Sequence, residues 1–464
     1  MADTWVLRAI SAIGLASMIG IAWAISIDRK AFPWRVVLWG TGLQLVFGVF
    51  VLKTALGLAL FSVLNEVVVQ LLAFTDEGSR FLFGDYLDDH FTVALNVLPT
   101  IIFFSSLMTV LYHVGVMQRV VRGVAWVMQR TMRTSGAETL SAAANIFVGQ
   151  TEAPLVIKPY VGKMTQSELM AVMVGGFATV AGGVMAAYVG MLHEHFPGIA
   201  GHLVAASVMS APAALVIAKV LLPERETAQT ATTLEFKSEK EHANIIDAAA
   251  SGAGEGLKLA LNVGAMLLAF LALVAMVNYL LALPAHWHNQ LEWAHALDAL
   301  RRATLDVPTG CEAPSGASAY AECLARVDEL GATHSPLVVW EPLSMQRILG
   351  VVLWPVAFVM GVPVADCSVV ASLLGEKIVL NEFVAYLHLS ENLRGAAPMS
   401  ERAAVITSYA LCGFANFGSI AIQIGGISAI APERRADLAR LGLRAMIGGT
   451  LAAFATACVA GILV

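Results

Sequence analysis

The amino-acid sequence predicts an all-α membrane protein, because it combines very few charged residues with long apolar runs. The chain has 464 residues, of which 58% are hydrophobic and 13% are charged, and its mean hydropathy is +0.74. Soluble domains carry about 25% charged residues and roughly 45–50% apolar ones. The composition therefore excludes an ordinary soluble enzyme and a disordered protein. The apolar residues come in runs rather than in alternation, which argues against an outer-membrane β-barrel.

A transmembrane helix needs about 20 mainly apolar residues, and the sequence offers eight such spans. In chain order they are Trp5–Ile27, Trp34–Phe61, Phe91–Gly115, Ser167–Leu192, His202–Leu222, Leu257–Leu283, Glu401–Ile430 and Leu438–Val464. No small-residue cleavage site follows the first span, so we interpret it as a retained helix and not as a signal peptide. The shorter run Val63–Phe74 ends in acidic residues and is expected to lie at the membrane interface.

Charged residues between the spans predict which connections face the cytoplasm. Basic residues concentrate in four connections, at Arg29, Lys30 and Arg35; Arg119, Arg122, Arg130 and Arg133; Lys219, Arg225, Lys237, Lys240 and Lys258; and Arg434, Arg435, Arg440 and Arg444. The opposite side carries Asp76, Glu77, Asp85, Asp88 and Asp89, with Arg80 as its one basic residue. The positive-inside rule places the four basic connections in the cytoplasm. Both termini are then expected outside the cytoplasm.

Two apolar regions, Gly136–Tyr160 and Pro342–Leu389, do not fit as single spans. Both ends of the first region are expected on the cytoplasmic side of the membrane, and both ends of the second region on the opposite side. Each region contains Gly, Pro and a glutamate, Glu152 in the first and Glu382 in the second. Irregular backbone at membrane depth is tolerated where protein or a water-filled cavity covers it. We therefore predict two re-entrant helical hairpins that enter from opposite sides.

A short internal repeat supports this organisation. The segment Gly176–Gly182, GFATVAG, resembles Gly413–Ser419, GFANFGS, and each follows one of the predicted hairpins. A repeat of opposite orientation is typical of secondary transporters whose site lies near the bilayer midplane. We expect N-terminal scaffold helices in 1–90, a first repeat in 91–222, a cytoplasmic loop in 223–256 and a second repeat in 257–464.

The segment Ala285–Glu341 is the main polar insertion and is expected outside the cytoplasm. It contains eight acidic and three basic residues. Cys311 and Cys323 both lie in it, and in an oxidising compartment they could form a disulfide; two free thiols are the alternative. The remaining cysteines lie in apolar runs and are interpreted as small packing residues.

Polar residues inside the apolar regions predict the functional site. Asn145, Gly149 and Glu152 are spaced i, i+4, i+7 and share one helical face, which Pro154 then interrupts. A broken helix exposes backbone N–H and C=O groups that can bind a polar solute or an ion. The structural alternative for Glu152 is an ion pair with Lys158.

The second repeat supplies a matching polar set. Glu382 follows Asn381 in an otherwise apolar stretch, and pairing with Lys377 is its structural alternative. Asn416, Ser419 and Gln423 share one face, where interhelical hydrogen bonding is the alternative. A site made of carboxylates and amides without an arginine favours an uncharged, hydroxyl-rich solute or a cation over a phosphate.

The sequence also argues against other classes of function. We expect no enzyme, because neither a nucleophile–base pair nor a metal-ligand spacing is present, and no nucleic-acid partner, because the net charge is −6. Without a GxxxxGK[ST] motif, an ion gradient or the solute itself must supply the energy.

Three long motifs resemble the signature of the concentrative nucleoside transporter family. They are Gly149–Leu155 (GQTEAPL) with Lys158–Tyr160 (KPY), Asn381–Tyr386 (NEFVAY), and Cys412–Ile420 (CGFANFGSI). The likeness runs from about Phe91 to the C-terminus, with the motifs in the family's order. It implies a sodium-coupled nucleoside symporter of the bacterial inner membrane that forms homotrimers. A proton-coupled symporter is the alternative, with Glu152 taking up the proton, and a non-transporting receptor or membrane enzyme is a more distant one.

The resemblance also implies a role for each site residue. Gln150 and Thr151, with Glu152 through water, would bind the nucleobase, and Val184 and Phe414 would supply apolar contacts. Glu382, Asn416 and Ser419 would bind the ribose hydroxyls. The implied sodium ligands are the side chains of Asn145 and Thr179 and the main-chain carbonyls of Val148 and Val180. The insertion 285–341 looks longer than the family's usual connection.

Overall fold

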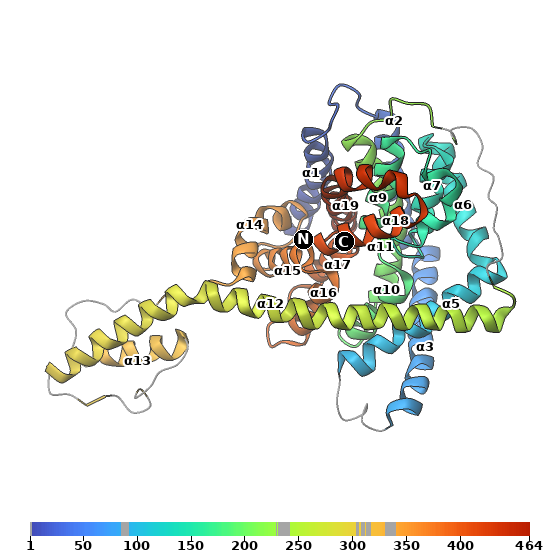
Figure 1. Ribbon diagram of the computed structural model, residues 1–464. Coiled ribbons are helices and arrows are strands. Elements are labelled where there is room, and N and C mark those ends of the chain that lie inside the picture. Colours follow the sequence, from blue (N-terminus) through green and yellow to red (C-terminus); the bar gives the residue numbers. More distant parts are fainter. Residues whose placement is uncertain are drawn as a thin grey trace.

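In a computed structural model, the chain is described over residues 2–84, 92–228, 230, 242–302, 306–307, 311, 317–329 and 340–464. These residues form helices joined by short connections, without a β-strand among them, which confirms the all-α class (Figure 1). Within these described ranges, eight helical segments are long and apolar enough to cross a membrane; they include 55–83, which was not predicted as a span, and not the predicted span Glu401–Ile430. Some residues used in the predictions above lie outside the described ranges, namely Lys237, Lys240, Asp85, Asp88, Asp89 and Phe91.

Three helices open the chain: α1 (Ala2–Ala24), α2 (Trp34–Lys53) and α3 (Ala55–Phe83). Thr54 separates α2 from α3 because its backbone is extended and its hydroxyl accepts a hydrogen bond from Gly57 N–H at 3.0 Å. The predicted boundaries are therefore wrong here, since the second span ends before Phe61 and Val63–Phe74 is part of a helix of 29 residues. This helix is itself long and apolar enough to cross a membrane, which speaks against the interfacial placement expected for Val63–Phe74.

The third predicted span is found as a short π-helix (Val93–Val97) that continues into α5 (Leu98–Val114). Gly115 ends α5 with a φ of 85°, a conformation that glycine adopts without strain. The next helix, α6 (Val116–Met132), was not predicted. It is amphipathic, and it buries Met117, Val121, Met128 and Met132 at helical spacing.

The region of the first predicted hairpin forms two short helical arms, and its re-entry into the membrane stays a prediction. One arm is α7 (Gly136–Ala144), and the other is a 3-10 turn (Ala153–Ile157) followed by α8 (Lys158–Val161). The fourth span follows as two pieces, α9 (Gln166–Ala178) and α10 (Gly182–Leu192). The fifth span is α11 (Ile199–Leu221), close to its predicted range.

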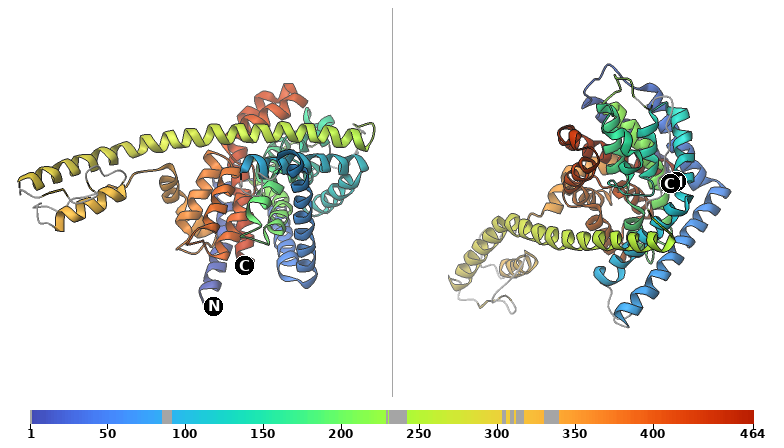
Figure 2. Two further views of the ribbon diagram at one scale, coloured as in Figure 1. Left: turned by 90° about the horizontal axis from the view of Figure 1, so that it is seen from below. Right: turned by 45° about the vertical axis from the view of Figure 1, so that its right-hand side comes forward.

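The sixth span is far longer than predicted. Helix α12 (Ile245–Arg302) is continuous over 58 residues and carries Pro284 inside it (Figures 1 and 2). The helix therefore continues beyond Leu283, where the predicted span ends, and the first residues of the polar insertion 285–341 are helical. The start of that insertion continues the helix and projects away from the rest of the molecule beside α13 (Ala317–Glu329) (Figure 1).

A disulfide joins Cys311 to Cys323, which confirms the bridge expected from the sequence. It is part of a small separate core between the end of α12 and α13, made by Trp293, Ala296, Leu300, Cys311, Tyr320, Cys323, Leu324 and Val327. The insertion thus contains a folded, cross-linked unit of its own.

The second predicted hairpin region contains three helices and not two: α14 (Met345–Val359), α15 (Cys367–Val379) and α16 (Glu382–Arg394). The hairpin is the pair α15–α16, with its tip at 380–381, so its expected start at Pro342 is wrong. Gly361, with a φ of 89°, follows α14 and lets the chain turn toward α15. The seventh span is broken into α17 (Glu401–Leu411) and α18 (Phe417–Ile430), and after a 3-10 turn (Pro432–Arg434) α19 (Arg435–Leu463) ends the chain.

The basic connections meet at one end of the molecule, as the charge pattern predicts. The first hairpin begins and ends there too. Hydrogen bonds and an ion pair join these connections and the base of the hairpin to one another. They run from Ile27 N–H to the Leu221 carbonyl, from Arg225 to Asp28, from Arg35 to the Thr131 carbonyl, from Thr165 to Glu224, from Ser135 to Glu168, and from Arg434 to the Met164 carbonyl. Which side of the membrane this end faces stays a prediction.

The opposite end carries both termini and the ends of the second hairpin. Arg8 donates to the Val464 carbonyl at 2.7 Å, and N and C lie close together in Figure 1. Arg402, in the first turn of α17, donates to the carbonyls of Gly361 and Gly461. The two hairpins therefore begin and end at opposite ends of the molecule, which is the arrangement expected of an inverted repeat.

Candidate functional site

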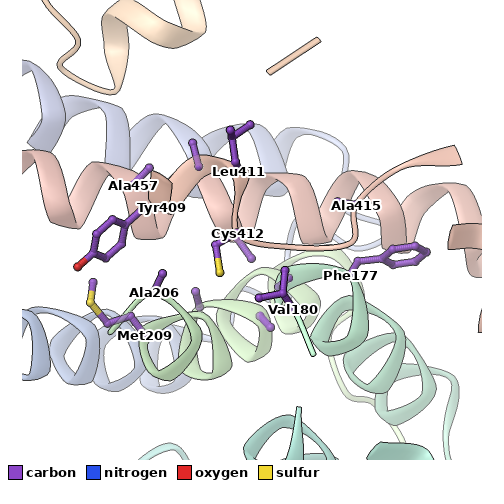
Figure 3. Close-up of a cluster of buried hydrophobic side chains, with 14 of the residues drawn as sticks. Phe177, Val180, Ala206, Met209, Tyr409, Leu411, Cys412, Ala415 and Ala457 are labelled. Atoms are coloured by element: carbon purple, nitrogen blue, oxygen red, sulfur yellow. The ribbon is translucent and has the colours of Figure 1, made fainter. Parts of the chain in front are cut away.

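The site is built where the two broken helices meet. The breaks fall inside the two repeated motifs, at residues 179–181 between α9 and α10 and at 412–416 between α17 and α18. Phe414 N–H donates to the Thr179 carbonyl at 3.3 Å, which joins the breaks directly. Gly413, with a φ of 151°, lies so close that a Cβ there would be 2.7 Å from the Phe177 carbonyl oxygen. Figure 3 shows the buried apolar side chains of the two breaks side by side.

Asparagines position the polar groups of the second repeat. Asn381 caps the N-terminus of α16, its side chain accepting from Val384 N–H at 2.9 Å, and Asn416 caps α18 by accepting from Ser419 N–H at 2.8 Å. An Asn side-chain oxygen at this position satisfies a backbone donor that the helix leaves free. The caps begin each helix at the tip or break, so Glu382 and Ser419 are held in the first turns that face the site.

Glu382 is the buried carboxylate of the site, 5% exposed. Its Oε1 accepts from the Tyr188 hydroxyl at 3.1 Å, and its Oε2 accepts from Asn416 Nδ2 at 3.0 Å. The alternative of an ion pair with Lys377 is not found, since Lys377 Nζ donates to the Ala410 carbonyl at 2.8 Å. The carboxylate is therefore held by two neutral donors from two other helices, α10 and the start of α18.

A pair of glutamines links the first hairpin to α18. Gln423 Nε2 donates to Gln150 Oε1 and to the Met173 carbonyl, both at 3.0 Å. Gly176 allows this contact, because a Cβ there would lie 2.6 Å from Gln423 Nε2. Thr151 lies over Gly426 in the same way, with its Cγ2 2.6 Å from the position of a Cβ. Gln150 and Thr151 are thus placed against α18, on the side where the hairpin loop meets the broken helices.

The other predicted site residues differ in exposure. Glu152 is exposed and accepts from the Thr151 hydroxyl at 2.9 Å, so the alternative pair with Lys158 is not what holds it. Val184 is buried on α10, one helical turn before Tyr188. Phe414 is half-buried in the break between α17 and α18. The predicted site residues thus include one exposed carboxylate and two apolar side chains that are buried or half-buried.

The predicted cation ligands gather at the break of α9–α10. Asn145 packs against Gly175, where a Cβ would lie 3.3 Å from Asn145 Nδ2, and Thr179 Oγ1 donates to the Gly175 carbonyl at 3.0 Å. Gly182 N–H donates to the Phe147 carbonyl at 3.1 Å, which brings the backbone beside Val148 to the same break.

One observation tests whether these residues fit a cation. Asn145 Oδ1 is buried and has no hydrogen-bond partner among the described residues. A buried polar oxygen without a partner is costly, and a hard cation such as Na⁺ would satisfy it. The neutral oxygens of Asn145, Thr179 and the Val148 and Val180 backbone are the donor type such an ion prefers.

The predicted site residues thus come from four elements that the fold brings together: the first hairpin, the α9–α10 break, the tip of the second hairpin and the α17–α18 break. The sequence-based site missed Tyr188, whose signal is its place one turn after Val184 on the same face of α10. Gln423 was singled out only by its spacing from Asn416, and its contact with Gln150 was not foreseen.

Family models match nearly the whole chain. The model described as the C-terminus of Na⁺-dependent nucleoside transporters matches residues 202–461, the corresponding N-terminal model matches 13–86, and a "nucleoside recognition" gate model matches 94–194. The chain is 42% identical to solute carrier family 28 member 3 of Eptatretus stoutii and 41% identical to sodium/nucleoside cotransporter 1 of Mus musculus. These alignments cover 97% and 98% of this chain, which spans 60% and 63% of the length of those two relatives.

Relatives of the same length are also found. An uncharacterized transporter of Haemophilus influenzae is 38% identical, over 98% of this chain and 97% of that one. The structure resembles CNTnw in an inward-facing substrate-bound state, with 39% identity, a TM-score of 0.81 and 98% of both chains covered. It resembles an outward-facing variant of CNTnw equally well, with a TM-score of 0.82.

Proposed function

The chain belongs to the Na⁺-dependent, or concentrative, nucleoside transporter family, and we propose that it is a secondary active symporter that imports nucleosides across the inner membrane with a sodium gradient. The observation that carries the proposal is Glu382, a buried carboxylate held by the neutral donors Tyr188 and Asn416 at the meeting point of the broken helices. Such a group is expensive inside a membrane protein and is typical of a transport site.

We infer that the nucleoside lies with its ribose toward Glu382, Asn416 and Ser419. A carboxylate accepts two hydrogen bonds and an amide both donates and accepts, which suits the vicinal hydroxyls of a ribose. The base would then lie toward Gln150, Thr151 and, through water, Glu152, with Val184 and Phe414 along its apolar faces. A phosphorylated nucleoside is disfavoured, because the site contains no arginine to pair with the phosphate.

Sodium would bind next to this site, through Asn145, Thr179 and the Val148 and Val180 carbonyls. The unpartnered Asn145 oxygen at the tip of the first hairpin supports this placement. The same hairpin carries Gln150 and Thr151, so a bound ion would hold the loop that contacts the base. Each ligand would then favour binding of the other, which is the coupling that symport requires.

We propose that the hairpins and broken helices move together against scaffold helices that assemble three copies of the chain. Long helix α12 supports this assembly, because its apolar residues Leu261, Leu268 and Tyr279 are 64%, 77% and 64% exposed in the single chain. A homotrimer would cover part of such surface, while lipid would cover the rest. The mass of the protein–detergent complex, measured by light scattering, should correspond to three copies; a monomer with full uptake would contradict this assembly.

The decisive experiment is uptake of [³H]uridine into proteoliposomes under separately imposed gradients. We expect accumulation with an inward sodium gradient and little with sodium equal on both sides. Uptake that responds to neither a sodium nor a proton gradient would overturn symport. Stoichiometric binding without accumulation would indicate a receptor instead.

Proton coupling is the second candidate, and one observation favours it at Glu382 over Glu152. A proton-coupling carboxylate must be shielded from water in part of the cycle. Glu152 is exposed, whereas Glu382 is buried beside neutral donors and without a hydrogen-bonded cation. Uridine uptake driven by an inward proton gradient in the absence of sodium would support this alternative.

A further inference from the structure

A cavity of about 690 Å³ lies between α14 and the second hairpin, apart from the nucleoside site. Its walls come from α14, α15 and α16, and they include both apolar and charged side chains. The charged residues that line it are Arg347, Glu376, His388 and Glu391. None of these four has a part in the proposed binding of nucleoside or sodium.

At this cavity, a hydrogen bond between a histidine and a glutamate joins the two arms of the hairpin, and it becomes an ion pair when the histidine is protonated. His388 Nδ1 on α16 lies 2.7 Å from Glu376 Oε2 on α15. The glutamate side chain is 3% exposed, while the histidine is 30% exposed. The carboxylate is therefore shielded from solvent and depends on its partner, whereas the imidazole can exchange a proton through the cavity.

The pair lies close to the tip of the hairpin. Glu376 comes five residues before Asn381, and His388 comes six residues after Glu382. At 1.5 Å per residue, this is roughly 8 Å from the tip that positions Glu382. The hydrogen bond between Glu376 and His388 thus helps to set the separation of the arms directly below the proposed ribose subsite.

The other groups around His388 leave Glu376 as its main partner. Glu391 lies one turn further on α16 and adds a second negative charge, and Arg347 on α14 is paired with Glu341 at 2.5 Å. The two other helices packed against α16 direct their polar groups elsewhere: α10 gives the Tyr188 hydroxyl to Glu382, and α17 receives the Tyr386 hydroxyl at the Ser408 carbonyl.

We propose that Glu376 and His388 form a proton-operated clasp that controls nucleoside affinity by holding the two arms of the second hairpin together. Histidine changes charge between about pH 5 and 8. Protonated His388 pairs with Glu376 as an ion pair, and neutral His388 leaves a weaker hydrogen bond to a buried carboxylate. Nucleoside affinity is then highest at low pH and decreases as His388 loses its proton. This proposal rests on the proposed nucleoside site.

The clasp differs from proton coupling in a measurable way. A clasp proton binds and leaves on the same side, through the cavity, so it changes affinity without moving through the protein. A coupling proton enters the vesicle with the nucleoside. By linkage, bound nucleoside must also increase the proton affinity of the clasp.

The test is [³H]uridine binding to the purified full-length protein in nanodiscs, at saturating sodium, between pH 5.5 and 8.5. For the wild type we expect Kd to increase by about five- to tenfold across this range, the effect of weakening one charge-assisted hydrogen bond. His388→Gln and Glu376→Gln should each make Kd nearly independent of pH. His195→Gln, on an exposed loop, is the matched control and should keep the wild-type pH dependence.

Three results would overturn the clasp: a wild-type Kd that does not change with pH, an unchanged pH dependence in His388→Gln, or uridine-linked acidification of proteoliposomes, read with an internal pH dye, that the wild type shows and His388→Gln lacks. If His388→Gln fails to fold, Glu376→Gln, which keeps the shape of the side chain, decides the same question. Failure of the proposed function itself looks different, because then uridine binds at no pH in any variant.

Discussion

Glu382 shows what a single residue contributes to this site. A buried carboxylate without a hydrogen-bonded cation is unfavourable, and the hydrogen bonds from Tyr188 and Asn416 offset only part of that cost. The unused acceptor capacity of the carboxylate is what a ribose diol would satisfy. Binding of a nucleoside would then satisfy hydrogen-bond acceptors of the buried carboxylate that the protein itself leaves unpaired.

We predict that Glu382→Gln and Asn416→Ala each reduce uridine uptake by at least about tenfold. Each change removes or leaves unpaired a buried hydrogen-bonding group, which costs roughly 1–3 kcal/mol, or about tenfold for each 1.4 kcal/mol. Initial uptake rates in proteoliposomes measure the effect. Ser428→Ala is the control, since its hydroxyl bonds to the Gly425 carbonyl in its own helix. Normal uptake by both site variants would show that the ribose lies elsewhere.

Asn145 tests the sodium site separately from the nucleoside site. We predict that Asn145→Ala loses most of the sodium dependence of uptake, because the unpartnered buried Oδ1 is the one side-chain amide oxygen among the proposed ligands. Uridine uptake at a series of sodium concentrations measures the change. A variant that folds and keeps the wild-type sodium dependence would exclude this position.

At the scale of the elements, each hairpin is tied at its base to the broken helix that follows it. In the first repeat, Ser135 at the start of α7 donates to Glu168 in the first turn of α9 at 2.5 Å. In the second, Ser400 at the start of α17 donates to Asp366 at the start of α15 at 2.6 Å. The matching contacts at opposite ends of the molecule are consistent with hairpin and broken helix acting as one unit in each repeat.

Lys219 secures the base of the first hairpin to α11. Its Nζ lies 2.7 Å from Glu138 Oε2, and both side chains are nearly fully buried. We predict that Lys219→Met destabilises the protein by about 3–5 kcal/mol, because it leaves the Glu138 carboxylate buried without its partner. Thermal unfolding in detergent should show a clear decrease in the midpoint. Lys258→Met, at an exposed position on α12, should leave it unchanged, and Glu138→Leu with Lys219→Met should recover part of the loss.

The elements with strong local signals could be predicted from the sequence. The two helix breaks fall inside the repeated motifs, where Gly413 requires a positive φ, and the tip of the second hairpin lies at Asn381, which is a helix cap. The polar site residues could also be predicted, because they stand inside otherwise apolar segments. Tyr188 did not, because an aromatic residue on an apolar helix is predicted as packing until its hydroxyl partner is known.

The errors share a cause: hydropathy marks apolar runs but not where the backbone hydrogen bonds of a helix stop. Thr54 ends α2 inside a continuous apolar run, so one predicted span became two helices. The opposite error occurred after Leu283, where the sequence becomes polar while α12 continues to Arg302 through Pro284. That extension is stabilised by a tertiary contact, the small core closed by the Cys311–Cys323 disulfide, which periodicity in one segment cannot reveal.

At the scale of the whole molecule, charge and oxidation state point to the same topology. The basic connections share one end, and the positive-inside rule assigns that end to the cytoplasm. The disulfide unit extends from α12 in a long polar insertion, and disulfides persist in oxidising compartments. Both arguments predict that the insertion lies outside the cytoplasm, and they rest on different chemistry.

We therefore predict that Cys311 and Cys323 are bridged in intact cells and can be reached from outside. A membrane-impermeant maleimide should not label them before mild reduction and should label both afterwards, as mapped by mass spectrometry. The buried Cys367, Cys412 and Cys458 serve as the internal control and should stay unlabelled until the protein is unfolded. Labelling of the insertion only after the membrane is permeabilised would reverse the topology, and with it the side from which each hairpin enters. Because the insertion is remote from the site, Cys311→Ser with Cys323→Ser should keep uridine uptake within about twofold of the wild type while removing this label.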